Sequence, residues 1–178
     1  MKVAERDKVA EILEDDDAVS LCSLYAGNET FGIDTRKIRE VLGERDLQRV
    51  PMSPPFIAGV VPYRGEVLTT VNLRALLGLE TQSGSCCVLV MDDDEAMERF
   101  GLVVDAVGGV VTVSARMLED NPSTLEARGR WLFDGAYKIE NGLMVRLDPQ
   151  KLCPARLSEA GLFRRGANGG LDASPDRR

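Results

Sequence analysis

The chain has 178 residues and a mass of 19.4 kDa, and 44% of its side chains are hydrophobic, enough for one compact core or for two very small domains that share one. Its 22 basic and 29 acidic residues give a net charge of −7, which repels phosphate backbones and anionic lipids, so we expect no nucleic-acid partner. The absence of histidine removes the commonest general base and the usual zinc nitrogen ligand.

The four cysteines are Cys22, Cys86, Cys87 and Cys153, and no pair has the Cys-x-x-Cys spacing of a zinc or redox site. We therefore expect no metal and no other cofactor, and we interpret Cys86 and Cys87 as small buried side chains. No apolar stretch reaches membrane-spanning length, and the N-terminus lacks the apolar core of a signal peptide. The sequence predicts a cytoplasmic protein with reduced thiols and no direct membrane insertion.

Two tails are predicted to flank one folded region. Residues 1–17 carry a few apolar side chains at helical spacing and end in an acidic run, which indicates a short helix or a frayed tail. Residues 154–178 are expected to form a short helix and then a disordered tail, because the last segment is Gly-rich and almost free of apolar residues. The folded region is expected to span residues 18–153.

Short strands separated by turn residues dominate the folded region. The pattern predicts four hairpins: 19–25 with 29–33 across Gly27-Asn28, 57–63 with 66–72 across Arg64-Gly65, 85–91 with 100–107 around the acidic turn at 92–95, and 131–139 with 142–147 across Glu140-Asn141. A further strand at 110–113 is expected after Gly108-Gly109. Asn72 is expected to start a short helix that Gly78 ends.

One longer helix is predicted over residues 34–43. Its signals are a cap, an apolar stripe at i, i+3 and i+4, and a left-handed stop: Asp34, then Ile38, Val41 and Leu42, then Gly43. Glu40 would lie on the opposite face of this helix, so we expect it at the surface.

A weak internal echo divides the sequence into two related halves. Phe31-Gly32-Ile33, a hairpin and Val71-Asn72-Leu73 recur as Phe100-Gly101-Leu102, a hairpin and Val145-Arg146-Leu147. Two small β-barrels, each with a short helix at its mouth, would explain so many short strands, although uniform β patterning would give the same echo.

The residues alone indicate a binding module rather than an enzyme. Residues 92–95 form the densest carboxylate cluster, but consecutive side chains do not converge on one point, so we expect a solvated hairpin tip. Arg64, held forward at a tight turn, offers forked hydrogen bonds to a partner, and Glu40 is free to pair with such an arginine. Ordinary surface charge is the alternative for both. Unpaired strand edges offer a second way to bind.

In their order, these segments resemble the CheW-like family of chemotaxis coupling proteins. The likeness in the first half lies in Phe31-Gly32-Ile33-Asp34, Ile38-Arg39-Glu40-Val41, Arg49-Val50-Pro51 with Pro54, residues 56–65, and Val71-Asn72-Leu73-Arg74. The second half adds residues 100–107 and 143–147 with Leu152. The most specific part is the Gly-Val-x-x-x-Arg-Gly hairpin after a Val-Pro-x-x-Pro connector.

The resemblance implies both a fold and a role. The fold would be mainly β, with two interlocked five-stranded SH3-like β-barrels and a few short helices. The protein would be a non-enzymatic adaptor that joins the cytoplasmic tip of methyl-accepting chemoreceptors to the regulatory domain of a CheA-type histidine kinase. It would be recruited to membrane-associated receptor arrays. An adaptor of a non-flagellar chemosensory pathway is the alternative within the family.

By matching position, the resemblance also implies partner-binding residues: Ile38, Glu40, Gly59, Arg64, Gly65 and Val110. Glu40 and Arg64 would form a central ion pair, and the two glycines would shape the hairpin. The chain departs from the family pattern at Pro62-Tyr63, in place of Asn-Leu, and at Asn72, in place of a common Asp. Because Pro62 has no backbone donor, its strand must lie at a sheet edge or end there.

Two rivals come from other classes. A small β-barrel enzyme or ligand-binding protein would need two carboxylates from separate strands in one pocket, and the sequence identifies no such pair. A nucleic-acid-binding barrel would need a basic face and exposed aromatic side chains, whereas aromatic residues are 5% of this acidic chain.

Overall fold

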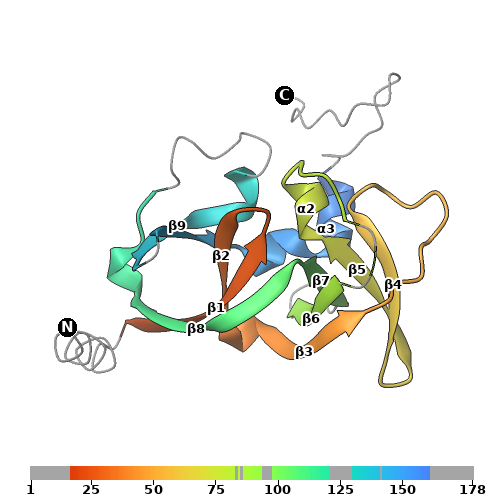
Figure 1. Ribbon diagram of the computed structural model, residues 1–178, viewed down its shortest axis with the longest axis horizontal. Coiled ribbons are helices and arrows are strands. Elements are labelled where there is room, and N and C mark those ends of the chain that lie inside the picture. Colours follow the sequence, from red (N-terminus) through yellow and green to blue (C-terminus); the bar gives the residue numbers. More distant parts are fainter. Residues whose placement is uncertain are drawn as a thin grey trace.

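The computed structural model describes residues 17–82, 84, 86–93, 98–120, 130–140 and 142–160, without the side chain of Asp93. Over these residues ten strands form two five-stranded sheets (Figure 1), with the orders β8-β1-β2-β10-β9 and β3-β6-β7-β5-β4. The strands are β1 (Ala18–Ala26), β2 (Glu29–Asp34), β3 (Ile38–Arg45), β4 (Ile57–Tyr63), β5 (Glu66–Asn72), β6 (Cys86–Asp93), β7 (Glu98–Val104), β8 (Ala106–Ser114), β9 (Phe133–Ile139) and β10 (Gly142–Leu147). The short helices are η1 (Thr35–Lys37), α2 (Leu73–Leu76), η2 (Ala115–Met117), η3 (Arg130–Leu132), η4 (Pro149–Leu152) and α3 (Pro154–Glu159).

The two sheets are interlocked because they exchange strands. Strands β1 to β5 and β6 to β10 repeat one arrangement, in which the first two strands of each repeat join the last three strands of the other. Strand β2 runs parallel to β10, with Phe31 opposite Val145, and β5 runs parallel to β7, with Val71 opposite Leu102. The echo in the sequence is thus a structural repeat. However, each repeat is divided between both sheets, so neither half of the chain is a barrel by itself.

The predicted fold class, mainly β with two interlocked five-stranded units, is confirmed. Each unit is an open sheet rather than a closed barrel, because the continuous ladders stop at the edge strands β8 and β9 in the first sheet and β3 and β4 in the second. One isolated bridge spans each gap: Glu119 to Ala136 in the first sheet and Gln48 to Val60 in the second.

One apolar core joins both sheets and the C-terminal helix. It contains Phe31 of β2 and Phe133 of β9, whose ring centroids are 6.0 Å apart, together with Phe100 of β7 and Leu157 of α3. Full burial of a side chain of this size contributes about 1.5–3 kcal/mol. A smaller cluster that includes Tyr63 lies within the second sheet. Because the main core is shared, the two sheets form one structural unit.

The predicted hairpins are confirmed, because each depends on a local turn signal. The β1–β2 turn contains Gly27 at φ +63°, and β4 and β5 have the predicted bounds. Asn141, in the β9–β10 turn, and residues 94–97, at the tip of the β6–β7 hairpin, lie outside the described residues. The short helix α2 is also confirmed, and the Asn72 Oδ1 caps it by accepting a hydrogen bond from the Ala75 N–H at 3.2 Å.

The helix predicted over residues 34–43 is wrong. Asp34 caps only the single 3-10 turn η1, and the chain then continues as strand β3. The pairing of β3 with β6 shifts register before Glu40 and again before Gly43, which has φ +68°. Each shift is a β-bulge that interrupts the alternation of side chains, so the apolar positions fall at a spacing that imitates a helix.

Strand β8 is the second difference from the prediction. The strand expected at 110–113 is longer, and the glycines at 108–109 lie inside it, while β7 already ends at Val104. A Cβ atom on Gly108 would clash with Ser23 Oγ and lie 3.0 Å from the Cε2 and hydroxyl oxygen atoms of Tyr25, both on the neighbouring strand β1. Gly108 therefore permits close approach of β1, and the two glycines continue the strand instead of forming a turn.

The predicted tails fall largely outside the described residues, which exclude 1–16 and 161–178. Within the described C-terminal part, α3 is the short helix that was expected after residue 154. No helix among the described residues is both long and apolar enough to cross a membrane.

Candidate partner-binding site

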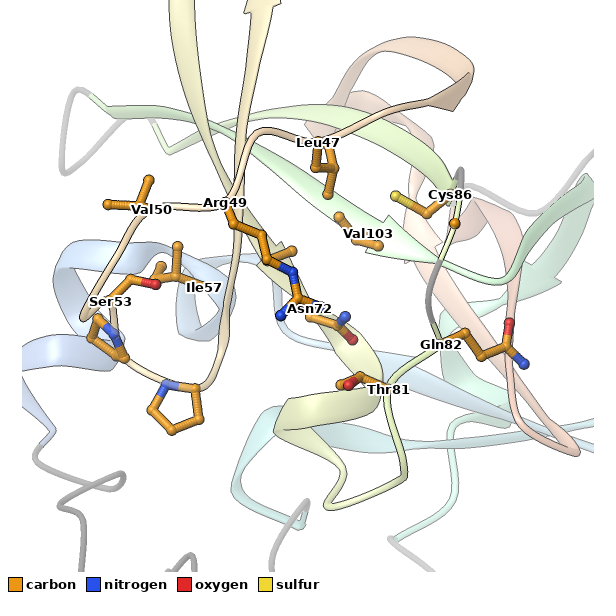
Figure 2. A pocket seen from close by; sticks show the side chains of 14 residues that line it. Leu47, Arg49, Val50, Ser53, Ile57, Asn72, Thr81, Gln82, Cys86 and Val103 are labelled. Carbon is orange, nitrogen blue, oxygen red and sulfur yellow. The ribbon is translucent and has the colours of Figure 1, made fainter.

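A pocket of about 440 Å³ lies beside the second sheet (Figure 2). One wall comes from residues 47–58, which lead from β3 into β4, and the other includes Thr81, Gln82, Gly84 and Cys86, between α2 and β6. Its described lining residues include no Asp or Glu, so they do not supply the carboxylate pair that a small β-barrel enzyme would need. Nor does the described part of the chain gather three metal-ligating side chains in one place.

The β4–β5 hairpin presents Arg64 at its tip. Arg64 and Gly65 have φ angles of 48° and 84°, and positive φ at both central residues is typical of a type I′ turn. Glycine adopts this conformation freely, whereas for arginine it is unfavourable by about 1–2 kcal/mol. The Arg64 side chain is 71% exposed. Pro62 lies on β4, which is an edge strand as its missing donor predicted.

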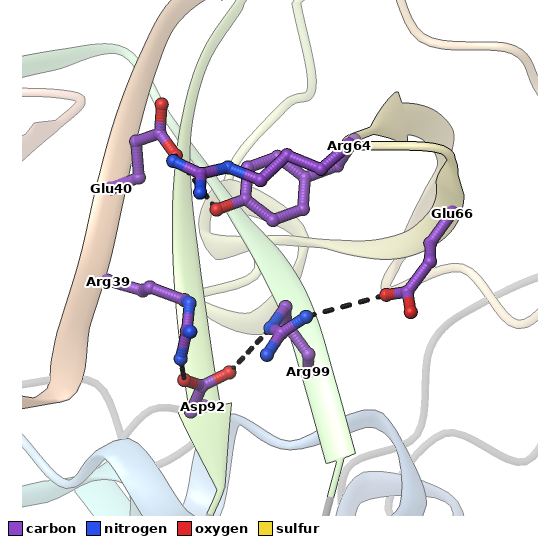
Figure 3. A network of polar contacts seen from close by, with 7 residues as sticks. Arg39, Glu40, Arg64, Glu66, Asp92 and Arg99 are labelled. Atoms are coloured by element: carbon purple, nitrogen blue, oxygen red, sulfur yellow. Dashed lines mark hydrogen bonds and ion pairs between the residues drawn. The ribbon is translucent and has the colours of Figure 1, made fainter.

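Glu40 of β3 faces this hairpin tip. Its Oε2 atom accepts hydrogen bonds from the Tyr63 hydroxyl and from Arg64 Nη2, both at 2.8 Å (Figure 3). The Arg64 guanidinium carbon lies 5.3 Å from the centroid of the Tyr63 ring, within the range of a cation–π interaction. The hydrogen bonds from Tyr63 and then Arg64 lower the pKa of Glu40. The ion pair expected between Glu40 and Arg64 is therefore present, although Glu40 lies on a strand.

A second set of ion pairs continues from the same strand. Asp92 of β6 accepts from Arg39 Nη1 at 2.6 Å and from Arg99 Nε at 2.8 Å, and Arg99 Nη1 lies 3.4 Å from Glu66 Oε2 (Figure 3). Although burial opposes ionisation of Asp92, the hydrogen bonds from the two arginines lower its pKa. The β-bulge before Glu40 explains why consecutive residues Arg39 and Glu40 both join these contacts.

We call these seven residues the charged network: Arg39, Glu40, Tyr63, Arg64, Glu66, Asp92 and Arg99. It contains Glu40 and Arg64 of the six predicted site residues, and Gly65 completes its turn. Ile38 is close in sequence, but its side chain packs against the main core. Ile38 therefore anchors the strand that carries Glu40.

The remaining two predicted residues lie elsewhere. Gly59 is near the start of β4, away from the turn, with φ +151°, and a Cβ atom there would lie 2.5 Å from the Gln48 carbonyl oxygen. Glycine at this position thus lets the chain after β3 approach the edge strand. Val110 is 63% exposed on β8, which belongs to the other sheet. A partner-binding role for Val110 stays a prediction.

Five residues of the charged network were missed as site residues: Arg39, Tyr63, Glu66, Asp92 and Arg99. Asp92 was expected in a solvated turn, but it lies on β6 directly opposite Arg99 of β7. The sequence could have indicated this ion pair, because the two residues of opposite charge stand at facing positions of the predicted hairpin. The hydrogen bond of Tyr63 depends on the bulge in β3, for which the sequence gives no local signal.

The chain is similar in sequence and in fold to known chemotaxis proteins. Residues 20–156 match the family model of the CheW-like domain. The chemotaxis protein CheW of Rhizobium meliloti is 26% identical over 140 residues, which cover 79% of this chain and 90% of the relative. The chemotaxis protein CheW of Thermotoga maritima is 27% identical over 130 residues, covering 73% and 84%. The crystal structure of the scaffolding protein TtCheW from Thermoanaerobacter tengcongensis matches with a TM-score of 0.65 at 20% identity, covering 75% of this chain and 91% of that one.

The two interlocked five-stranded sheets, with the charged network at the surface of the second, define a β-sheet protein of the scaffold type. The chain belongs to the CheW-like domain family, the adaptor family of chemotaxis signalling. The resemblance that its sequence motifs indicate is therefore confirmed.

Proposed function

We propose that this chain is a non-enzymatic adaptor that couples methyl-accepting chemoreceptors to a CheA-type histidine kinase. It binds the cytoplasmic tip of the receptor and the regulatory domain of the kinase, and it works in the cytoplasm at membrane-associated receptor arrays. Family membership supports this role. The observation that carries the proposal is an exposed arginine, Arg64, that Glu40 and Tyr63 hold in place at the tip of a stiff hairpin.

The charged network is better suited to binding a partner than to stabilising the fold. Exposed ion pairs contribute only about 0–1 kcal/mol to folding. One guanidinium nitrogen of Arg64 is bound to Glu40, and the side chain is otherwise largely open to solvent, so its remaining N–H groups are available to a carboxylate or carbonyl of a partner. Because the guanidinium is already oriented, less side-chain freedom is lost on binding.

The coupling mechanism is a shift of populations, with no bond made or broken by this protein. Receptor and kinase bind different surfaces of one rigid unit, since both sheets share the main core. Binding then favours one arrangement of receptor tip and kinase regulatory domain over the others, and the receptor's ligand state changes kinase activity through that difference in affinity.

The second candidate is an adaptor of a non-flagellar chemosensory pathway. Pro62 and Tyr63 stand directly before Arg64 and replace the Asn-Leu of the family pattern. Pro62 is exposed and changes the surface that a receptor would meet, and the buried Tyr63 orients Glu40 there, which favours a dedicated receptor. A pull-down with the tagged full-length chain from its source cells distinguishes the two pathways, because it identifies the receptor and the kinase together.

The substitution Arg64→Glu tests the site. Co-sedimentation of the full-length protein with membranes containing that receptor should weaken at least tenfold, while the fold, measured by circular dichroism and thermal unfolding, changes little. The control is Lys138→Glu, since Lys138 is also 71% exposed and in an ion pair but lies on β9 of the other sheet. Equal binding by wild type and both variants would refute the site assignment.

A further inference from the structure

The pocket beside the second sheet is lined by a positively charged side chain, that of Arg49. Arg49 extends across it toward Asn72 (Figure 2). Among the residues that the structure describes, Arg49 has no hydrogen bond or ion pair. The sequences from 47 to 58 and from 81 to 86, which supply most of the described lining residues, contain no Asp or Glu. This is an unusual composition for a pocket in a chain with a net charge of −7, because acidic residues outnumber basic ones elsewhere.

Asn72 contributes a neutral hydrogen-bond donor to the pocket. Its Oδ1 atom accepts the Ala75 N–H and so caps α2, which leaves the two amide N–H groups as donors for a ligand. Asp caps a helix as well as Asn does, so capping alone does not require the amide. An aspartate here would place a carboxylate in the same pocket as Arg49, whereas the amide leaves the pocket positive.

The other polar lining groups are also uncharged: Ser53, Thr81 and Gln82 offer hydroxyl and amide groups. The carboxylate of Asp105 lines a small adjoining recess, and two hydrogen bonds from Arg74 at 2.7 and 2.9 Å compensate its charge. Burial, the Cys87 thiol and the Asp46 carboxylate raise the pKa of the Cys86 thiol, which lines the pocket. Asp46 itself does not line the pocket.

We propose that this pocket binds a small oxyanion, a carboxylate or a phosphate, with Arg49 as the cationic fork and Asn72 as the neutral donor. A planar guanidinium makes two parallel hydrogen bonds to such a group. The volume of about 440 Å³ is within the range of small-molecule sites. Because the walls come from separate segments, a bound anion would connect the β3–β4 connector to the loop after α2. This site is independent of the proposed adaptor function.

Isothermal titration calorimetry of the full-length protein with inorganic phosphate and with citrate, at constant ionic strength against chloride, tests the proposal. We expect saturable binding of at least one probe. Arg49→Gln and Asn72→Asp should each weaken that binding at least tenfold, and Asn72→Asp should keep α2 capped and the melting temperature nearly unchanged. Lys138→Gln removes one positive charge from the other sheet and should bind like wild type.

Two outcomes would overturn the proposal. One is the absence of saturable binding for both probes, including the case in which only an acidic peptide binds. The other is wild-type affinity in the Asn72→Asp variant, which would show that the charge of this pocket does not select the ligand. Circular dichroism of Arg49→Gln guards against misfolding, and the exposed position of Arg49 makes a folded variant the expected result.

Discussion

Tyr63 illustrates, at the scale of single residues, how a departure from the family pattern builds part of the site. Its ring packs in the small cluster of the second sheet and is 4% exposed, while its hydroxyl reaches Glu40 on β3. The hydrogen bond to Glu40 raises the pKa of Tyr63, so the phenol stays protonated and acts as the donor. One side chain thus anchors the hairpin and orients the acidic partner of Arg64.

The substitution Tyr63→Phe should raise the pKa of Glu40 toward its ordinary value of 4.5, because the main hydrogen bond that favours the carboxylate is lost. Titration of the Glu40 carboxyl carbon by NMR measures this shift. A lowered folded-state pKa means that the contact is present above pH 4.5 and is lost as the pH falls through the folded value, so receptor binding should weaken in acid. An unchanged Glu40 titration in the variant would contradict the hydrogen bond.

Exchanging the charges of Glu40 and Arg64 distinguishes two roles of Arg64: direct contact with the receptor, and the internal ion pair with Glu40. The double variant Glu40→Arg/Arg64→Glu restores an ion pair of reversed polarity at the same two positions. If Arg64 contacts the receptor, the double variant should bind as weakly as Arg64→Glu in the co-sedimentation assay. Recovery to wild-type binding would mean that only the internal pair matters.

At the scale of elements, two glycines occupy equivalent places in the two sheets. Gly59 of β4 and Gly135 of β9 have φ of +151° and +147°, and a Cβ atom on either would lie 2.5 Å from a carbonyl oxygen, that of Gln48 or Glu119. These carbonyls belong to the isolated bridges that span the open side of each sheet. Close backbone approach at these bridges is thus a shared requirement of the two repeats.

Gly59→Ala and Gly135→Ala should each destabilise the protein by about 1–3 kcal/mol, because the added methyl group pushes the bridging backbone away. Urea unfolding followed by circular dichroism measures the loss. Gly109→Ala is the control, since a Cβ atom there meets nothing within 4 Å, and it should change stability by less than about 0.5 kcal/mol. Equal stability of Gly59→Ala and the control would contradict the bridge.

Elements with local signals were predictable and elements set by distant contacts were not. The β4–β5 hairpin has the predicted bounds because Arg64-Gly65 specifies a two-residue turn. Strand β3 was mistaken for a helix because its two bulges arise from pairing with β6, about fifty residues later in the chain. The same pairing brings Arg39 to Asp92 of β6, so the wrong helix prediction and the missed Arg39 have one cause.

At the scale of the whole molecule, Asp105 joins the two sheets. It lies between β7 of the second sheet and β8 of the first, and its N–H donates to the Tyr25 carbonyl at 2.9 Å. Its carboxylate accepts from the Gly27 N–H at 2.8 Å and makes two hydrogen bonds with Arg74 of α2. The contact therefore connects a hairpin of one sheet to a helix that follows a strand of the other.

Asp105→Asn should lower the free energy of unfolding by about 1–2 kcal/mol at pH 7, as loss of a partly buried charged hydrogen bond does. Hydrogen bonds from Arg74 lower the pKa of Asp105 below its ordinary 3.8, although burial opposes this. The stabilisation is thus present above pH 3.8 and is lost as the pH falls through the folded value. Urea unfolding at several pH values should show wild type and variant converging in acid. A constant difference would contradict the assignment.

The architecture of the whole molecule was predictable only in part from the residues. The echo between Phe31 and Phe100 indicated two repeats, but periodicity within a strand does not say which distant strand it pairs with. The exchange of strands between the sheets followed from the family resemblance, not from the pattern. The pocket around Arg49 was not predicted, because pairing between strands far apart in the sequence brings its walls together.

The central claim is that this chain couples a receptor to a kinase. The most direct measurement is co-sedimentation of the CheA-type kinase with receptor-containing membranes, with and without this protein. We predict that the kinase pellets when the wild-type chain is added, and that neither omission of the chain nor its Arg64→Glu variant supports pelleting. Kinase that pellets equally without the chain, or equally with the variant, would contradict this account.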